Sequence, residues 1–406
     1  MTPPDRELAG QRIARARRRR GLSQAVLAGL VGRSESWLSQ VERGKRGVDS
    51  HSVLVRLTEV LRVDIEELTG PGDQDDNSRR AYPAASLIEQ AMMGYGAPGP
   101  GDGGEEPERE VSLDFLRAQA RSAYQAYQAT RYDAAGHILP GLIRAMETAA
   151  RTAGSASPAA CAVRARVYDT TAALLSRVGE PFLAWAAADR AMFAAEQSGD
   201  PLLAAASAWR LSYMITGRKH PQEALELAMA AAAALERTTR APSPERLSVY
   251  GALHLAAATA AAASLDRTTT ESLLTTACGI AVRTGEANHM GTAFGPVNVA
   301  IHAISASLRL GDPRTATETG EALDLAAMPV GLVGRRTQVN LDLARAYAMT
   351  RKDAAAVNLL LAAERLSPQL VRYDPVTRDV LTELLRREHR PSTPELRPLA
   401  RRAGVI

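Results

Sequence analysis

The chain has 406 residues, 46% of them hydrophobic and 23% charged, so it can fill two or more globular domains and is too apolar to be disordered. Its two cysteines make no disulfide framework and suit a reducing cytosol. No signal peptide opens the sequence, and no apolar run reaches membrane-spanning length. We therefore expect a cytoplasmic protein without a membrane partner.

The net charge of +4 is concentrated near the N-terminus. Residues 1–70 hold 13 Lys and Arg against 9 Asp and Glu, whereas residues 71–406 hold 36 of each kind. A small basic domain on a neutral body predicts one part that meets a polyanion and another part with a different role.

The basic segment shows a series of short helices and no strand pattern. Ser23 and Ser34 stand at N-cap positions before the second and third predicted helices. A fourth helix over 50–63 and a short fifth helix over 64–70 complete the expected domain of residues 1–70.

The rest of the chain divides into a linker, a repeat region and a tail. Residues 71–110 are the expected linker, because the stretch 94–107 has nine Gly or Pro in fourteen positions. From 111 to 390, apolar helices alternate with Ala-rich ones, and turn signals recur every 40 to 48 residues, roughly. Helix pairs at a regular spacing need neighbours to bury their faces, which favours an α-solenoid of tetratricopeptide-like pairs over an irregular helical bundle. Residues 391–406 are the expected C-terminal tail.

The third predicted helix has an apolar inner edge and a polar outer face. Leu38 and Val41 face inward, with Trp37 at the edge of that stripe. The polar face suits the DNA major groove, where Gln40 can pair with adenine and Glu35 can accept from the cytosine amino group. We expect phosphate contacts from the basic side chains and from the Gln24 side-chain amide at the start of the second predicted helix. The predicted DNA-binding residues are Gln24, Arg33, Ser34, Glu35, Ser36, Ser39, Gln40, Arg43, Lys45 and Arg46.

The stretch LSQAVLAGLVGRSESWLSQVERGKR resembles the helix-turn-helix of the xenobiotic-response-element family, which includes lambdoid phage repressors. The resemblance implies an all-α, five-helix, lambda-repressor-like domain that binds double-stranded DNA at an inverted-repeat operator as a homodimer. It also implies DNA contacts by Gln24 and Gln40 and a structural role for Glu42. The chain departs from the family after GKRG, where proline is usual and Val48 stands instead. The alternative is a helix that only packs or contacts another protein. The matching positions are Ser23, Gln24, Leu27, Ala28, Gly32, Ser34, Leu38, Ser39, Glu42, Gly44 and Arg46.

The segments 290–312 and 334–387 resemble the repeat domain of actinobacterial regulators that carry this type of head. The layout is also similar to that of peptide-sensing quorum regulators of Gram-positive bacteria, in which a repeat solenoid holds a short peptide. The resemblance implies that the repeats dimerise and sense a short peptide or small-molecule effector.

Polar and aromatic residues in the repeats mark candidate ligand-binding positions. Asn298 and His302 lie four residues apart on one helix face, and an asparagine amide can both donate to and accept from a peptide backbone. The alternative for each candidate is an interhelical hydrogen bond or an ordinary surface position. The predicted ligand-binding residues are Trp209, Arg210, Tyr213, Asn298, His302, Arg335, Arg336, Asn340 and Tyr347.

No catalytic or metal-binding motif stands out. The seven histidines show no metal-ligand spacing, and the glycine-rich segment lacks the Gly-Lys-Ser/Thr of a phosphate-binding loop. We therefore expect no enzyme, no cofactor and no metal. A ligand-sensing transcription regulator is the first hypothesis, a repeat-based protein-interaction adaptor the second, and an enzyme in the helical body the third.

Overall fold

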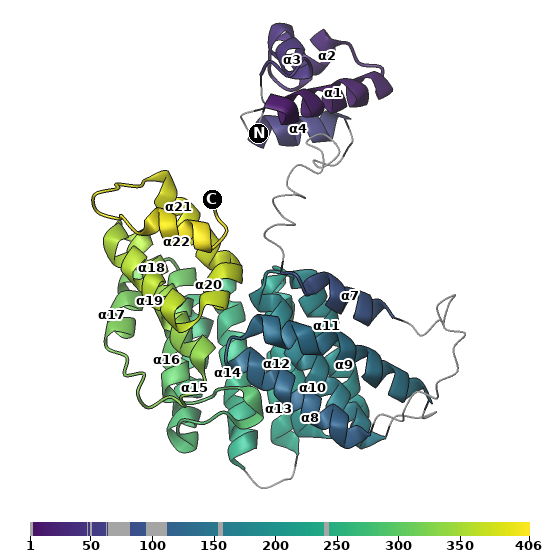
Figure 1. The fold of residues 1–406 in the computed structure, drawn as a ribbon. Coiled ribbons are helices and arrows are strands. Elements are labelled where there is room, and N and C mark those ends of the chain that lie inside the picture. Colours follow the sequence, from purple (N-terminus) through teal and green to yellow (C-terminus); the bar gives the residue numbers. More distant parts are fainter. Residues whose placement is uncertain are drawn as a thin grey trace. The chain divides into compact units, whose positions relative to one another are not determined.

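The computed structural model describes residues 3–46, 48, 51–61, 63, 82–94, 112–152, 157–238 and 243–406. These residues form helices and no strand, which confirms the predicted all-α fold. The chain divides into two compact units, Met1–Ala81 and Tyr82–Ile406 (Figure 1). Within the described ranges, no helix is long and apolar enough to cross a membrane.

The first unit is a small helical domain around an apolar core. Ser23 and Ser34 cap the second and third helices as predicted, and their hydroxyls accept from the backbone N–H of Val26 and Trp37 at 3.2 Å. The predicted fifth helix, 64–70, lies outside the described residues. The core includes Ile13, Leu27, Leu38, Val41, Leu57 and Leu61. The helices are α1 (Pro3–Arg19), α2 (Gln24–Leu30), α3 (Glu35–Glu42) and α4 (His51–Leu61).

The second unit stacks helix pairs in sequence order (Figure 1). The first helices of the pairs are α8 (Leu113–Gln128), α10 (Pro158–Arg177), α12 (Pro201–Gly217), α14 (Pro244–Ala263), α16 (Pro296–Arg309) and α18 (Val333–Met349). The second helices are α9 (Tyr132–Thr152), α11 (Pro181–Gln197), α13 (Pro221–Arg237), α15 (Arg267–Thr284), α17 (Pro313–Glu321) and α19 (Asp353–Leu366). Each first helix also contacts the first helix of the next pair, so these six form one continuous layer, here named the inner layer. This arrangement is the predicted α-solenoid of tetratricopeptide-like pairs.

All six pairs are joined by the same kind of three-residue turn. The middle residue of each turn has a positive φ, between 55° and 85°, which ends the first helix and reverses the chain. Only two of these middle residues are glycine, so the backbone repeats regularly although the sequence carries no regular glycine signal. The six middle residues are Thr130, Gly179, Lys219, Leu265, Gly311 and Arg351.

The helical body extends beyond the range 111–390 that the sequence predicted. Helix α7 (Ala85–Met93) lies in the expected linker, yet it buries Ile88 and Met92 and packs on α9. Its apolar edge suffices for docking, although the Gly/Pro run that follows dominates the local composition. In the expected tail, α22 buries an apolar edge against α21. Beyond the pairs lie η1 (His289–Gly291), α20 (Pro368–Tyr373), α21 (Pro375–Arg386) and α22 (Leu396–Arg402).

The first two repeats touch the last repeat and the helix that follows it, so the inner layer curves back on itself. At the start of α9, the Asp133 backbone N–H donates to Gln369 Oε1 at 3.0 Å, and Gln369 Nε2 donates to Asp133 Oδ2 at 2.8 Å. At the end of α10, Arg177 Nη1 donates to Gln338 Oε1 of α18 at 2.8 Å. Side chains from early and late inner-layer helices can therefore meet in one place.

Candidate DNA-reading surface and inner-layer site

A buried ion pair holds α3 against the two helices before it. The Glu42 carboxylate accepts from Arg17 Nε at 2.6 Å and from Arg17 Nη2 at 2.9 Å. Gln24 Nε2 donates to the same carboxylate at 2.6 Å. The hydrogen bond to Glu42 raises the pKa of the Arg17 guanidinium, which keeps the pair ionised. The Arg17–Glu42–Gln24 network therefore fixes the orientation of α3.

The network changes the part that Gln24 can play. Its amide nitrogen was expected to point toward a phosphate, but in the structure this nitrogen donates to Glu42. Only the second N–H of the amide and the exposed N-terminal turn of α2 remain for a phosphate. The structural role of Glu42 that the family resemblance implies matches its burial, with 9% of the residue exposed.

The outer face of α3 is polar and open. Glu35 and Ser36 are exposed in its first turn, and Ser39 and Gln40 are half-buried one turn further on. The Ser34 hydroxyl is used for capping. These side chains lie on the helix face opposite Leu38 and Val41, as the sequence predicted.

Four basic residues surround that face. Arg43 folds back on α3, with Nε donating to the Ser39 carbonyl and Nη2 to the Ser39 hydroxyl, both at 3.0 Å. The Arg33 guanidinium lies 5.8 Å from the centre of the Trp37 ring. Lys45 and Arg46 are exposed just past the helix end. Apart from Gln24 of α2, the predicted DNA-contacting residues thus lie on the outer face of α3 and at its two ends.

Aromatic and polar side chains of the second unit meet on three inner-layer helices. The Tyr213 ring of α12 lies 5.8 Å from the Trp209 ring and 6.0 Å from the His302 ring of α16, between ring centres. The Tyr213 hydroxyl is 3.4 Å from His302 Nε2, and Thr259 Oγ1 of α14 is 3.4 Å from His302 Nδ1. His302 is therefore enclosed by polar and aromatic neighbours.

Three arginines lie around this aromatic group. Burial alone would raise the pKa of the Tyr127 hydroxyl, but the charges of Arg210, Arg177 and Arg335 outweigh burial and lower it. Burial lowers the pKa of His302, and the charges of Arg335 and Arg177 lower it further. The geometry agrees with this electrostatic coupling, because Arg177 of α10 bonds to Gln338 of α18, one turn after Arg335, and Arg210 lies over the Trp209 ring of α12. We name the inner cluster by its members Tyr127, Arg177, Arg210, Tyr213, His302 and Arg335.

The structure brings together some predicted ligand residues and separates others. Trp209 packs beside the inner cluster, and Asn298 lies one turn before His302. Arg336 instead donates to the Met328 carbonyl, and Tyr347 donates to Glu321. Asn340 is five residues after Arg335 in α18 and so lies on another face of that helix.

Sequence reasoning missed Tyr127, Arg177 and Gln338. Each belongs to a different repeat from its partners, and no local spacing marks it. Arg177 would have been found only by knowing that α10 touches α18.

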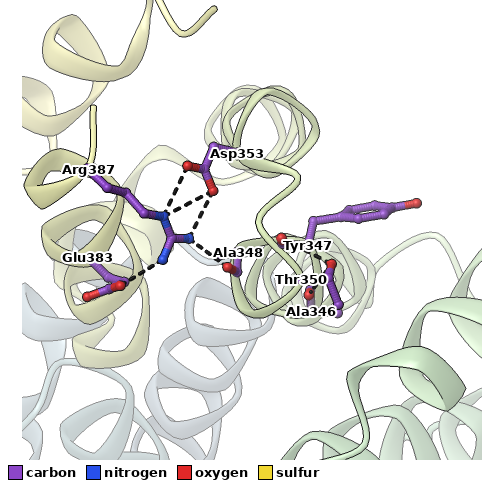
Figure 2. A network of polar contacts seen from close by, with 7 residues as sticks. All are labelled: Ala346, Tyr347, Ala348, Thr350, Asp353, Glu383 and Arg387. Carbon is purple, nitrogen blue, oxygen red and sulfur yellow. Dashed lines mark hydrogen bonds and ion pairs between the residues drawn. The ribbon is translucent and has the colours of Figure 1, made fainter. Parts of the chain in front are cut away.

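A separate pocket of about 530 Å³ lies near the C-terminus, lined by α19, α21 and the segment before α22. Figure 2 shows the arginine network beside it. Arg387 donates to Asp353 at 2.9 and 3.0 Å, to Glu383 at 2.7 Å and to the Ala348 carbonyl at 2.6 Å. This guanidinium is fully occupied by protein acceptors, so it joins α21 to the last repeat. Among the described residues, no three His, Cys, Asp or Glu side chains are grouped to hold a metal.

Comparison with known proteins identifies the domain type of the first unit. Residues 8–69 match the family model described as a helix-turn-helix domain. No curated protein matches the chain. Among solved structures, the chain is similar to Bacillus thuringiensis PlcR in complex with the peptide PapR7 and DNA, at 12% identity and a TM-score of 0.34 over 87% of this chain and 99% of that one. That likeness is too distant to support an argument about this chain. The family match confirms the resemblance of the head: the chain carries an N-terminal helix-turn-helix domain of the xenobiotic-response-element type, a domain of DNA-binding regulators, ahead of an α-solenoid.

Proposed function

We propose that the protein is a sequence-specific transcription regulator that reads DNA through the outer face of α3. The observation that carries this proposal is the pairing of an open polar face with a rigid support. Glu35, Ser36 and Gln40 lie on that face, while the buried Arg17–Glu42 pair fixes the helix behind them. A side chain can discriminate bases only when its backbone is held in place.

The side chains of the head divide into base-reading and phosphate-binding groups. Gln40 suits a bidentate contact with adenine, and Ser36 and Ser39 suit several bases. Arg33, Arg43, Lys45 and Arg46 supply positive charge for phosphates. In this proposal, two heads of a homodimer bind the two halves of an inverted repeat.

The second unit has two roles in the proposal. It holds the two protomers together, and it binds a small effector, such as a short peptide, at the inner cluster. Binding that favours one conformation of the solenoid would change the spacing of the two heads and hence the affinity for paired half-sites. The contact between α10 and α18 would change on binding, because an effector beside Arg177 would alter its hydrogen bond to Gln338.

Selection of DNA from a random pool by the full-length protein tests the proposal. We expect enrichment of an inverted repeat with half-site centres roughly one helical turn apart. Gln40→Ala should relax one base position in each half-site, at a cost of about 1–3 kcal/mol for the preferred base. Gln11→Ala is the matched control, because Gln11 is an exposed amide on α1, away from the outer face of α3.

The selection also has a result that would contradict the proposal. If no sequence is enriched and binding depends on salt alone, the head is not a base reader under these conditions. Repeating the selection with cell extract then separates a head that requires an effector from one that does not read sequence.

A repeat-based adaptor is the second candidate. Large apolar side chains stand exposed on α11, with Phe182 at 69% and Phe193 at 57% exposure. Exposed rings on a solenoid helix suit a protein partner. Two results together would favour this candidate. The first is a protein partner that binds the wild type in stoichiometric amounts but not Phe193→Ser, and the second is a DNA selection that enriches no sequence.

A further inference from the structure

Among the described residues, no carboxylate forms an ion pair with any of the three guanidinium groups of the inner cluster. Arg177 bonds to the neutral amide of Gln338. Burial opposes its charge, but Tyr127, Tyr132 and Asp374 outweigh burial and raise the pKa of Arg177. Arg387, by contrast, pairs with two carboxylates. Like charges gathered inside a protein are costly unless something of opposite charge joins them.

Three carboxylates near the cluster form no ion pair with it, although Asp169 Oδ1 has no hydrogen-bond partner. Asp374 caps α21, where it accepts from the backbone N–H and the hydroxyl of Thr377, both at 2.8 Å. Asp342 accepts from Gln338 at 2.9 Å and from Ser305 at 2.5 Å. Asp169 accepts from Ser207 at 3.2 Å. None of the three lies within ion-pair distance of an inner-cluster arginine.

Besides Asp169 Oδ1, two buried polar atoms beside the cluster have no partner among the described residues. They are Arg210 Nε, a donor, and Asn298 Oδ1, an acceptor. Buried polar groups are almost always paired, so each unpaired one requires an explanation. A ligand with both an oxyanion and an N–H or O–H donor would satisfy both.

We propose that the inner cluster binds the oxyanion of a small organic ligand, a carboxylate or a phosphate, between Arg177, Arg210 and Arg335. Guanidinium groups bind such anions through paired N–H donors, which lysine cannot reproduce. The inference rests on the proposed effector-sensing role of the second unit and gives the chemical class of the effector.

The surroundings of the arginines suit an organic molecule better than a bare inorganic ion. The Arg210 guanidinium lies 4.5 Å from the centre of the Trp209 ring. The Trp209 and Tyr213 ring centres are 5.8 Å apart, and the Tyr213 and His302 ring centres are 6.0 Å apart. Aromatic surfaces next to a charged anchor favour a ligand with an apolar body. The hydroxyls of Tyr127 and Tyr213 add donors for the anion.

The test is thermal unfolding of the full-length protein with citrate, inorganic phosphate or 4-phenylbutyrate, each compared with sodium chloride at equal ionic strength. We expect at least one anion to raise the Tm of the second unit by several degrees above the chloride control. A response to citrate or 4-phenylbutyrate alone points to a carboxylate, and a response to phosphate alone points to a phosphate.

Two variants show whether the response comes from the inner cluster. Arg335→Met keeps an unbranched, flexible side chain but removes the guanidinium and its charge, so the anion-dependent rise in Tm should disappear. Arg283→Gln is the matched control, because Arg283 is exposed on α15, outside the inner layer, and the rise should remain. Folding of Arg335→Met is checked by its helical circular dichroism.

Two results would overturn the inference. One is a wild-type Tm that no anion raises above the chloride control, and the other is an anion response that Arg335→Met retains. In both cases the DNA-reading proposal stands or falls separately, because the DNA selection with Gln40→Ala does not depend on the inner cluster.

Discussion

The Arg17–Glu42–Gln24 network of the first unit and the inner cluster of the second unit hold arginine in opposite ways. In the first unit, Arg17 meets Glu42 in a two-pronged ion pair, and Gln24 completes the network. In the second unit, burial and the charges of Arg177 and Arg210 lower the pKa of Arg335, and no described carboxylate forms an ion pair with it. Both arrangements remove guanidinium groups from bulk water, but only the first supplies the counter-charge from the chain itself.

The difference indicates which unit is complete by itself. A paired charge is a structural joint, and its loss leaves the other charge uncompensated. An unpaired group of like charges destabilises the empty protein and leaves binding energy available for an anion. The comparison therefore predicts opposite signs for similar substitutions in the two units.

The largest expected effect is in the first unit. Glu42→Ala leaves Arg17 and Gln24 without their acceptor, at an expected cost of about 3–5 kcal/mol. Hydrogen–deuterium exchange of the full-length protein should show lost protection over residues 8–46 and unchanged protection in the repeats. Glu35→Ala is the control, because Glu35 is exposed in the first turn of the same helix. Unchanged protection over 8–46 in Glu42→Ala would show that the network is dispensable.

The first unit could be predicted from sequence because its signals are local. The caps Ser23 and Ser34 and the inner edge of Leu38 and Val41 all lie within a few residues of the helices they define. The bond from Gln24 to Glu42 could not be predicted in the same way. It joins residues 18 positions apart in the chain and depends on how α2 crosses α3.

The repeat architecture of the second unit could be predicted from the sequence, but the composition of the inner cluster could not. Helix pairs and the turns that join them follow from local patterns. Tyr127, Arg177 and Arg335 belong to three different repeats, and only the curvature of the inner layer brings them together. Arg336 and Tyr347, which were predicted together with Arg335, bond instead to Met328 and Glu321, because neighbours along α18 point to different faces.

The next largest effect is a pH dependence beside the inner cluster. Burial raises the pKa of Asp169 to about 6, against the opposing effect of the Arg210 charge. A raised pKa means that the folded protein binds this proton more tightly than the unfolded chain does. The stabilisation is therefore complete below about pH 4 and is lost as the pH rises through 6.

Asp169→Asn isolates this contribution, because the amide mimics the protonated acid and does not titrate. The variant should match the wild type near pH 4 and exceed it at pH 7 by roughly 3 kcal/mol. Urea unfolding at several pH values, followed by tryptophan fluorescence, measures the difference. A difference that stays constant with pH would mean that Asp169 has an ordinary pKa in the folded protein.

The smallest expected effect is that of Arg335→Met on the free energy of unfolding. It tests the contrast between the two arginine sites most directly, because here the loss of an arginine should stabilise the protein. Burial lowers the pKa of Arg335, and the charges of Arg177 and Arg210 lower it further, so the charged form is disfavoured in the folded protein. Without any anion, Arg335→Met should raise the free energy of unfolding by about 1 kcal/mol, measured as a higher urea midpoint at unchanged slope. The same change in the first unit, Arg17→Met, removes a guanidinium that is paired with Glu42, so it should lower the midpoint of that unit. If both variants lower the midpoint, Arg335 has a stabilising partner after all, and the Arg17 network and the inner cluster hold arginine alike.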